Sequence, residues 1–288
     1  MPFTFSKVLD HGSSNPIVAR LTLQVSELLA QCNISNERRD DVFDVCLNSL
    51  VRKLLRCWEI EARLQQDWEG AVSSYKPPEH GKAPRVLPQV ARLEEECHNF
   101  LYESKNYVRD VLKVFNLLYG TGFVEASEFS KPKRGKQSLV QYSEATFGEA
   151  DSRTLFFKGA SKGLEEIVDM RNAVEHPDGY SGALTIQNIR VGQGGQIAEP
   201  AWFRTDKGSQ VTEPSAVLDD MHVIINNLLS LGEVVVVSWA AKNLKMPQFM
   251  RIAPIPESAR DPARPIAWKV AATASLERQL SNLDSQKK

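Results

Sequence analysis

The feature that most constrains the fold is a helical stripe between residues 90 and 118. Side chains of one stripe recur there at steps of three and four, at Val90, Leu93, Cys97, Leu101, Ser104, Val108, Val111, Phe115 and Leu118, and all but Ser104 are apolar. This spacing places them on one face of an α-helix. Gly120-Thr121-Gly122 follows, and glycine just after such a pattern is typical of a helix C-terminus. The pattern predicts a helix over about 88–119 with one face buried.

The same periodicity predicts four further helices. They cover residues 16–32 after Asn15-Pro16, about 36–68 before Gly70, Asp151 or Ser152 to His176, and about 214–244 with Pro214 in the first turn. The proline- and glycine-rich residues 71–88 predict an irregular connection, and residues 120–137 predict a second loop. Helices therefore dominate the expected fold.

Two segments favour strands instead. Residues 183–191 alternate between apolar and polar side chains, Gly192 to Gly195 suit a turn, and residues 198–204 suit a returning strand. Residues 250–255 and 266–270 either pair as two more strands beside this hairpin or form a loosely attached arm. Residues 271–288 predict a short helix that frays into a polar end.

The expected fold class is mainly α: a bundle of about five long helices with a small β-hairpin or sheet near residues 183–204, and a further strand pair near 250–270. We expect residues 1–249 to form the helical bundle with the hairpin inserted. Residues 250–288 would be an extension that packs on the bundle or is partly disordered.

The charge balance limits the possible partners. The chain has 35 Lys and Arg residues against 36 Asp and Glu residues, a net charge of -1, and the two halves are each balanced as well. A large, non-specific polyanion-binding surface is therefore excluded. The share of hydrophobic residues, 42%, is typical of a globular protein with a buried core.

The chain shows the features of a cytoplasmic protein. We find no N-terminal basic region followed by an apolar run, and the longest apolar stretch, residues 233–241, is too short to span a membrane. We predict that this stretch is a buried helix. Cys32, Cys46, Cys57 and Cys97 form no C-x-x-C pair, so we expect reduced core thiols, no metal site and no cofactor.

One motif indicates a candidate catalytic site: Met170-Arg171-Asn172-Ala173-Val174-Glu175-His176-Pro177. Arg171 and His176 are separated by four residues, and Pro177 predicts that the helix ends at His176. On a straight helix, a five-residue offset rotates two side chains by about 140° from each other. They converge on one substrate only if the last turn unwinds or a second subunit contributes.

These residues resemble the HEPN superfamily, whose ribonuclease members carry an R-x4–6-H motif, often with a polar residue directly after the arginine. The resemblance covers six residues by motif and about residues 90–245 by the order of long helices. It implies metal-independent cleavage of RNA by a homodimer that completes its site across the interface. It also implies a role in a toxin–antitoxin or antiviral defence system, with an antitoxin or other defence protein as partner.

The resemblance also implies the roles of the residues. His176 is the general acid or base, since imidazole exchanges a proton near neutral pH. Arg171 holds the scissile phosphate, and Asn172 orients the histidine or bonds to the phosphate. Many family members carry a tyrosine two residues after the histidine. This chain has Asp178 there and Tyr180 two residues further on, which argues against regulation by adenylylation of that tyrosine.

A second cluster of basic residues is a candidate for extra RNA contacts. Residues 131–136 contain Lys131, Lys133, Arg134 and Lys136, which suit phosphate binding, although a solvated loop has the same composition. Glu103, Tyr107 and Arg109 either line the same cleft or lie on the exposed side of their helix. Trp58, Trp68, Trp202 and Trp239 are explained as core aromatics unless they are exposed enough to stack on bases.

The sequence leaves alternatives to the ribonuclease. Arg92 and His98 also fit the R-x4–6-H spacing, but Leu93 follows the arginine and the predicted helix contains both residues, so we interpret this match as accidental. Arg171 and His176 themselves also suit an ordinary helix-end cation and a C-terminal cap, with Glu175 as a solvated neighbour. The second hypothesis is therefore a non-catalytic helical protein that mediates interactions or senses nucleotides with the same fold.

Overall fold

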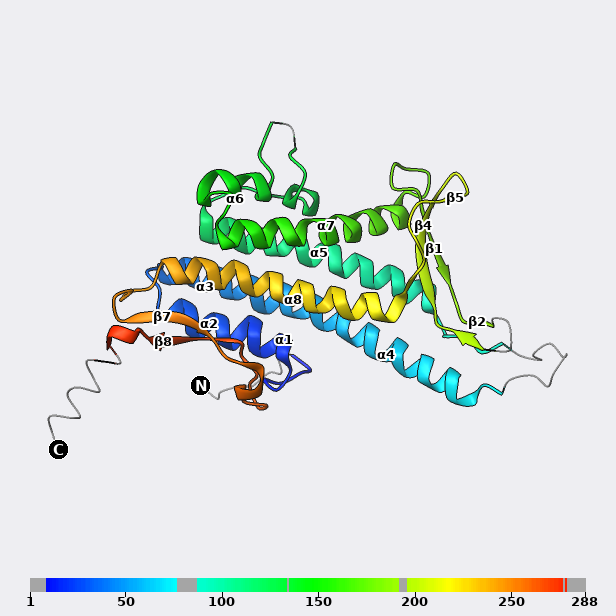
Figure 1. The fold of residues 1–288 in the computed structure, drawn as a ribbon, viewed down its shortest axis with the longest axis horizontal. Helices are drawn as coiled ribbons and strands as arrows, with labels where there is room; N and C mark the ends of the chain where they lie inside the picture. The colour runs from blue at the N-terminus through cyan, green and yellow to red at the C-terminus, as the bar shows by residue number, and fades with distance from the viewer. Residues whose placement is uncertain (1–8, 77–86, 134, 192–195, 277, 279–288) are drawn as a thin grey trace, which may run out of the picture. The chain divides into compact units, whose positions relative to one another are not determined.

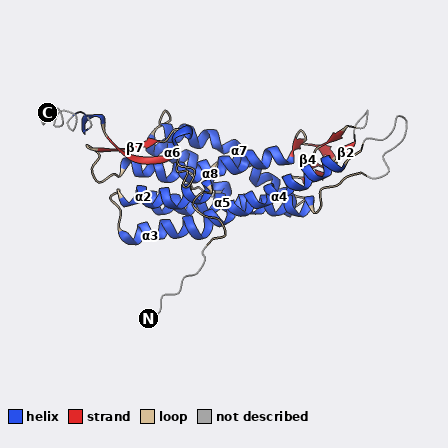
Figure 2. Ribbon diagram, turned by 90° about the horizontal axis from the view of Figure 1, so that it is seen from below, coloured by secondary structure: helices blue, strands red, loops and turns tan. Residues whose placement is uncertain are grey.

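The computed structural model describes residues 9–76, 87–133, 135–191, 196–276 and 278. Helices make up most of this part of the chain, and short antiparallel strands make up the rest of its regular structure (Figure 2). The mainly α fold class with small sheets is confirmed. The chain divides into two compact units, the first built from Met1–Arg52, Asp110–Val124 and Leu229–Lys288 and the second from Lys53–Arg109 and Glu125–Leu228.

The first unit begins with two interrupted helices. One consists of α1 (Pro16–Val18), the π-helical η1 (Ala19–Leu23) and α2 (Gln24–Ala30). The other consists of α3 (Asn36–Val45) and the π-helical η2 (Cys46–Val51), and it continues as α4 (Arg52–Ser74). The Asn15 side chain accepts a hydrogen bond from the Ile17 N–H (2.9 Å) and caps the first helix.

Helix α4 extends past Gly70, where the sequence predicted its end. A single glycine lowers helix stability by about 1 kcal/mol relative to alanine but does not forbid the helical conformation. Residues 71–74 are therefore helical and not part of the predicted irregular connection. Residues 77–86 of that connection lie outside the described residues.

The C-terminal segment of the first unit is a strand pair. Strands β7 (Met250–Pro254) and β8 (Trp268–Ala272) are antiparallel, with Ile252 opposite Val270, and the 3-10 turn η5 (Glu257–Ala259) lies between them. The predicted pairing is confirmed, but the strands form a sheet of their own and do not join the hairpin at 183–204. Residues 271 and 272 finish β8, and the predicted short helix begins at residue 274, three residues later than expected; residues 277 and 279–288 lie outside the described residues.

A buried polar cluster connects this strand pair to the first helix. The Glu233 carboxylate accepts hydrogen bonds from Arg20 and from Gln24 (2.8 Å). The Gln24 side chain in turn accepts from the backbone N–H groups of Ala267 (2.7 Å) and Trp268 (2.8 Å). Buried polar groups need such partners, so the cluster fixes the C-terminal segment to α2.

The second unit contains the Arg171 motif. Helix α5 (Leu93–Tyr119) contributes its residues up to Arg109, and helix α8 (Val217–Lys242) contributes its residues up to Leu228. Helices α6 (Leu139–Phe147) and α7 (Ser152–Glu175) lie against each other (Figure 1), and the 3-10 turn η3 (Ala126–Phe129) also contacts α7. Helix α6 is absent from the sequence prediction; Ser138 and Gln141 form its capping box.

Helix α5 begins five residues later than predicted. The Asn188 side chain accepts from the Val90 N–H and donates to the Val90 carbonyl, both at 2.9 Å, which holds this segment extended. Arg92 then has a positive φ of 54°. Residues 88–92 are therefore not helical, although Val90 is buried as its spacing predicts.

The chain runs from the end of α7 into a small sheet (Figure 1). Strand β1 (Ala183–Gln187) pairs antiparallel with β4 (Ala201–Asp206), which also pairs with β5 (Ser209–Gln210) and β6 (Ser215–Ala216). Strands β2 (Arg190–Val191) and β3 (Ile197–Ala198) form a separate pair. The hairpin is confirmed, and its turn, residues 192–195, lies outside the described residues.

Pro214 does not lie in the first helical turn, where the sequence analysis placed it. Helix α8 begins after β6, so Pro214 precedes a strand.

Gly182 occupies a tight position before β1. It has a φ of 69°, and a Cβ at this position would lie 2.1 Å from the Thr205 carbonyl oxygen. Only glycine fits where the chain enters β1 so close to β4.

Helix α8 is the one helix among the described residues that is long and apolar enough to cross a membrane. Most of its apolar window, 61%, is buried inside the protein. Glu233 lies within this helix, is only 2% exposed and has protein partners. Residues 233–241 therefore belong to a core helix, as predicted.

Candidate functional site

The Arg171 motif occupies the last turn of α7 and the turn that follows it. Helical geometry ends at His176 (φ −134°, ψ 69°), whose N–H still donates to the Asn172 carbonyl at 2.8 Å. The Gly179 N–H then donates to the His176 carbonyl at 2.8 Å, and a Cβ on Gly179 would lie 2.9 Å from that oxygen. The chain thus leaves the helix at the residue before Pro177, as the sequence predicts.

Arg171 lies in a mostly buried position. Its side chain is 13% exposed, and its guanidinium forms an ion pair with the Glu175 carboxylate one turn later. The guanidinium also lies over the ring of Tyr102 on α5, 5.5 Å from the ring centre. Burial lowers the pKa of Arg171, and the nearby Tyr102 opposes this shift.

His176 is the exposed member of the motif. Its side chain is 73% exposed, and its Nε2 atom lies 3.8 Å from Oε2 of Glu175. This is the same oxygen that Arg171 contacts. Because the last turn opens at His176, one carboxylate brings the arginine and the histidine together within a single chain.

Asn172 is held by neighbours on both sides. Its side-chain oxygen accepts a hydrogen bond from Nζ of Lys105 on α5 (2.8 Å), and its amide nitrogen donates to the hydroxyl of Tyr180 (2.7 Å). Burial lowers the pKa of Lys105, and the charge of Arg171 lowers it further. Two cationic side chains, Arg171 and Lys105, therefore lie on the same side of this helix end.

The basic loop lies further along α7. Lys131 forms an ion pair with Glu165 (3.7 Å), six residues or roughly 9 Å along the helix from Arg171. Lys133 and Lys136 are exposed and pair with each other through a β-bridge. Arg134 lies outside the described residues.

Several candidate residues lie where the sequence did not place them. Tyr107 is fully buried and not on an exposed flank, whereas Glu103 and Arg109 are half-buried. Arg92 precedes α5 and pairs with Glu95, so it does not share a helix with His98. Trp202 and Trp239 are core residues as predicted, but Trp58 is 36% exposed.

Sequence reasoning missed Lys105 and Tyr102. Both lie on α5 with Arg109 at helical steps of three and four, which places these three residues on one face. This polar face beside the apolar stripe could have identified Lys105 and Tyr102 as candidate site residues. The contact of that face with α7 was not readable from periodicity, because periodicity does not identify which helices pack together.

The described residues contain no group of three or more His, Cys, Asp or Glu side chains that could hold a metal ion. All four cysteines are free and buried. Burial raises the pKa of Cys32 to about 11 and those of Cys46, Cys57 and Cys97 to about 12. These thiols are therefore inert core residues.

Comparison with protein-family models, with curated proteins and with solved structures gave no significant match.

Proposed function

We propose that this protein is a metal-independent endoribonuclease of the HEPN type, with Arg171, Asn172 and His176 as its site. One observation carries the proposal: an exposed histidine and a mostly buried arginine contact the same carboxylate oxygen where α7 ends. The pair has the two groups that phosphodiester cleavage requires, a proton carrier open to solvent and a cation held in place.

The reaction proceeds without a metal ion. The ribose 2′-OH attacks the adjacent phosphorus, the bond from phosphorus to the 5′ oxygen breaks, and the products are a 2′,3′-cyclic phosphate and a free 5′-OH. His176 either takes the 2′-OH proton or supplies a proton to the leaving oxygen. Arg171 stabilises the charge of the pentavalent phosphate with its forked N–H donors.

Glu175 and Lys105 shape this site further. In the absence of RNA, the Glu175 carboxylate is paired with the Arg171 guanidinium. A substrate phosphate must therefore displace this carboxylate. Lys105 supplies a second positive charge beside Asn172, which favours that exchange. Asn172 acts as a positioning residue between Lys105 and Tyr180, in place of the direct contact with His176 that the resemblance implied.

The setting of the reaction follows from the resemblance. A homodimer would join two such sites across a two-fold axis, in the cytoplasm and within a toxin–antitoxin or antiviral defence system. Lys131, Lys133, Arg134 and Lys136 would add phosphate contacts at a distance from the cleaved bond. The near-neutral net charge fits a small local site of this kind better than an extended RNA-binding surface.

A non-catalytic helical protein is the second candidate. The observation in its favour is the Arg171–Glu175 ion pair, because an i, i+4 pair at a helix end also forms in proteins without any activity. In that case Arg171 and His176 would only finish the helix and connect it to β1.

The two candidates are separated by incubating mixed RNA with the wild-type protein in EDTA. We expect cleavage products with 2′,3′-cyclic phosphate ends, and a loss of rate of about 100-fold or more in Arg171→Ala and His176→Ala. Arg92→Ala and His98→Ala are matched controls, since these residues also fit the R-x4–6-H spacing, and should cleave like wild type. An inactive wild type, or equal cleavage by all variants, excludes the ribonuclease.

A further inference from the structure

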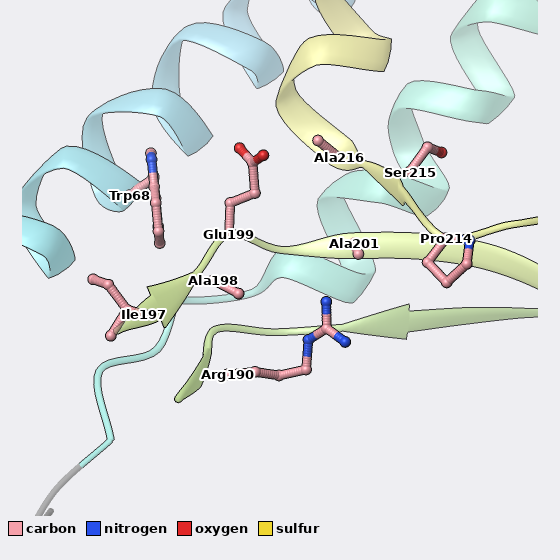
Figure 3. Close-up of a pocket in the computed structure, with 9 residues that line it drawn as sticks. All are labelled: Trp68, Arg190, Ile197, Ala198, Glu199, Ala201, Pro214, Ser215 and Ala216. Carbon is pink, nitrogen blue, oxygen red and sulfur yellow. The ribbon is translucent and has the colours of Figure 1, made fainter. Parts of the chain in front are cut away.

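An open pocket in the second unit lies apart from the Arg171 motif. It has a volume of about 520 Å³, within the range of about 300–1,000 Å³ typical of small-molecule sites. Trp68 of α4, Arg190 of β2 and Glu199 line it (Figure 3), together with small residues of the short strands. The remaining lining residues are Ile197, Pro214, Ser215 and the alanines at 198, 201 and 216.

The position of the pocket separates it from the candidate catalytic site. Ala201 pairs with Gln187 at the far end of β1, whereas the chain enters β1 from α7 at Ala183. These two ends of the strand are roughly 13 Å apart at 3.3 Å per residue. A ligand in the pocket is therefore distinct from a phosphate held by Arg171.

Three side chains of the pocket are available to a ligand. Figure 3 shows the ring of Trp68 beside the side chain of Glu199, and the guanidinium of Arg190 on the β2 side of the opening. Within the described part of the chain, these three side chains have no hydrogen bond or ion pair. Burial and the charge of Asp219 raise the pKa of Glu199, so the carboxylate gains from a ligand that donates hydrogen bonds.

Each side chain selects one feature of the ligand. The face of Trp68 favours a flat ring. The ionised carboxylate of Glu199 only accepts hydrogen bonds, with two oxygens side by side, and so selects two adjacent N–H donors. Arg190 only donates and carries a positive charge, which selects an anion such as phosphate.

From this combination we infer that the pocket binds a guanine nucleotide, with the base on Trp68, its N1–H and N2–H groups at Glu199, and its phosphate at Arg190. Guanine is the common nucleobase with two adjacent donors on its Watson–Crick edge. Adenine and cytosine offer an amino group beside a ring acceptor, and uracil offers one N–H between two carbonyls. The nucleotide is either free or part of an RNA strand, and the recognition is the same. The inference stands without the proposed ribonuclease activity.

The test is calorimetric titration of the full chain with GMP and IMP. These nucleotides differ only in the N2 amino group, and we expect GMP to bind at least about tenfold more tightly. Glu199→Gln should abolish this preference, since its amide offers a donor where the ligand also donates. Trp68→Ala should weaken GMP binding about tenfold or more, and Trp68→Phe should retain part of it. Glu149→Gln, an exposed acid of the same unit outside the pocket, is the matched control.

The source of the nucleotide is tested in a second arm with short RNAs that carry one guanosine or one inosine. His176→Ala protein is used, so that cleavage does not interfere. If the protein prefers the guanosine RNA over the inosine RNA but does not distinguish GMP from IMP, the ligand is part of a strand. If it also prefers GMP over IMP, the free nucleotide is a ligand. Three results would overturn the inference. The first is equal binding of GMP and IMP together with equal binding of the two RNAs, and the second is no binding in either arm. The third is a preference for guanine over hypoxanthine that survives in Glu199→Gln. None of these results depends on whether the wild type cleaves RNA.

Discussion

Each compact unit contains more than one Arg–Glu ion pair, and one pair from each, Arg20–Glu233 and Arg171–Glu175, can be compared because their surroundings differ. In the first unit, Glu233 is 2% exposed and also accepts from Gln24, which binds the backbone of the C-terminal segment. In the second unit, Glu175 is 41% exposed, and within the described residues the only further partner of its carboxylate is the solvent-exposed ring of His176. The two carboxylates therefore differ in burial and in their partners.

The exposure of the carboxylate determines which arginine is able to exchange its partner for a ligand. A buried carboxylate with two side-chain partners cannot leave without exposing unpaired polar groups. An exposed carboxylate has water as an alternative partner, and its arginine is then free to bind phosphate. Burial thus separates an Arg–Glu pair that the core holds in place from one whose carboxylate is open to exchange.

The largest effect is expected for Glu233→Ala. The substitution leaves Arg20 and Gln24 without their shared partner in the core and should lower the free energy of unfolding by about 3–5 kcal/mol. Urea denaturation measures this loss. Glu27→Ala is the matched control, since Glu27 forms an exposed pair with Arg264 in the same unit; a similar loss in both variants would contradict the comparison.

Asn172→Ala should have an intermediate effect. It removes the acceptor of Lys105 at 2.8 Å and the donor to Tyr180 at 2.7 Å. Because Lys105 is partly buried and charged, we expect a loss of about 1–2 kcal/mol in the free energy of unfolding. The double variant Asn172→Ala with Lys105→Met should recover part of this loss, and an additive loss would show that the two residues do not interact.

Glu175→Ala should change stability by less than about 1 kcal/mol, because its carboxylate is exposed. Under the proposed function it should also tighten binding of a non-cleavable dinucleotide phosphate several-fold, since Arg171 is released. Glu166→Ala, which changes an exposed acid on the same helix, controls for the loss of one negative charge. If both variants bind equally, Glu175 does not compete with phosphate for Arg171.

Sequence periodicity located the long helices because their apolar faces repeat over several turns. The end of α7 was predicted from Pro177, because a proline restricts the conformation of the residue before it. Periodicity failed where tertiary contacts decide the structure. Asn188 holds Val90 extended and delays α5, and the strand pair at 250–272 forms its own sheet, fixed through Gln24.

The part of the candidate site that is local in the sequence was predictable, and the part contributed by other elements was not. The motif identified Arg171, Asn172 and His176, because these residues are neighbours on one helix. Lys105 and Tyr102 come from another helix, and the pocket at Trp68 and Glu199 combines α4 with strands more than a hundred residues later. Such combinations follow from packing, which one sequence does not encode as a local pattern.

The smallest effect is expected for Tyr180→Phe. Its hydroxyl accepts from Asn172, but the side chain is 84% exposed, so water replaces the lost partner and the free energy of unfolding should change by less than about 0.5 kcal/mol. Cleavage of RNA should also stay within twofold of wild type, because Lys105 still holds Asn172. A loss above about 1 kcal/mol would mean that this exposed hydroxyl contributes as much as a buried hydrogen-bonding group, and the contrast between the two ion pairs would then not rest on burial.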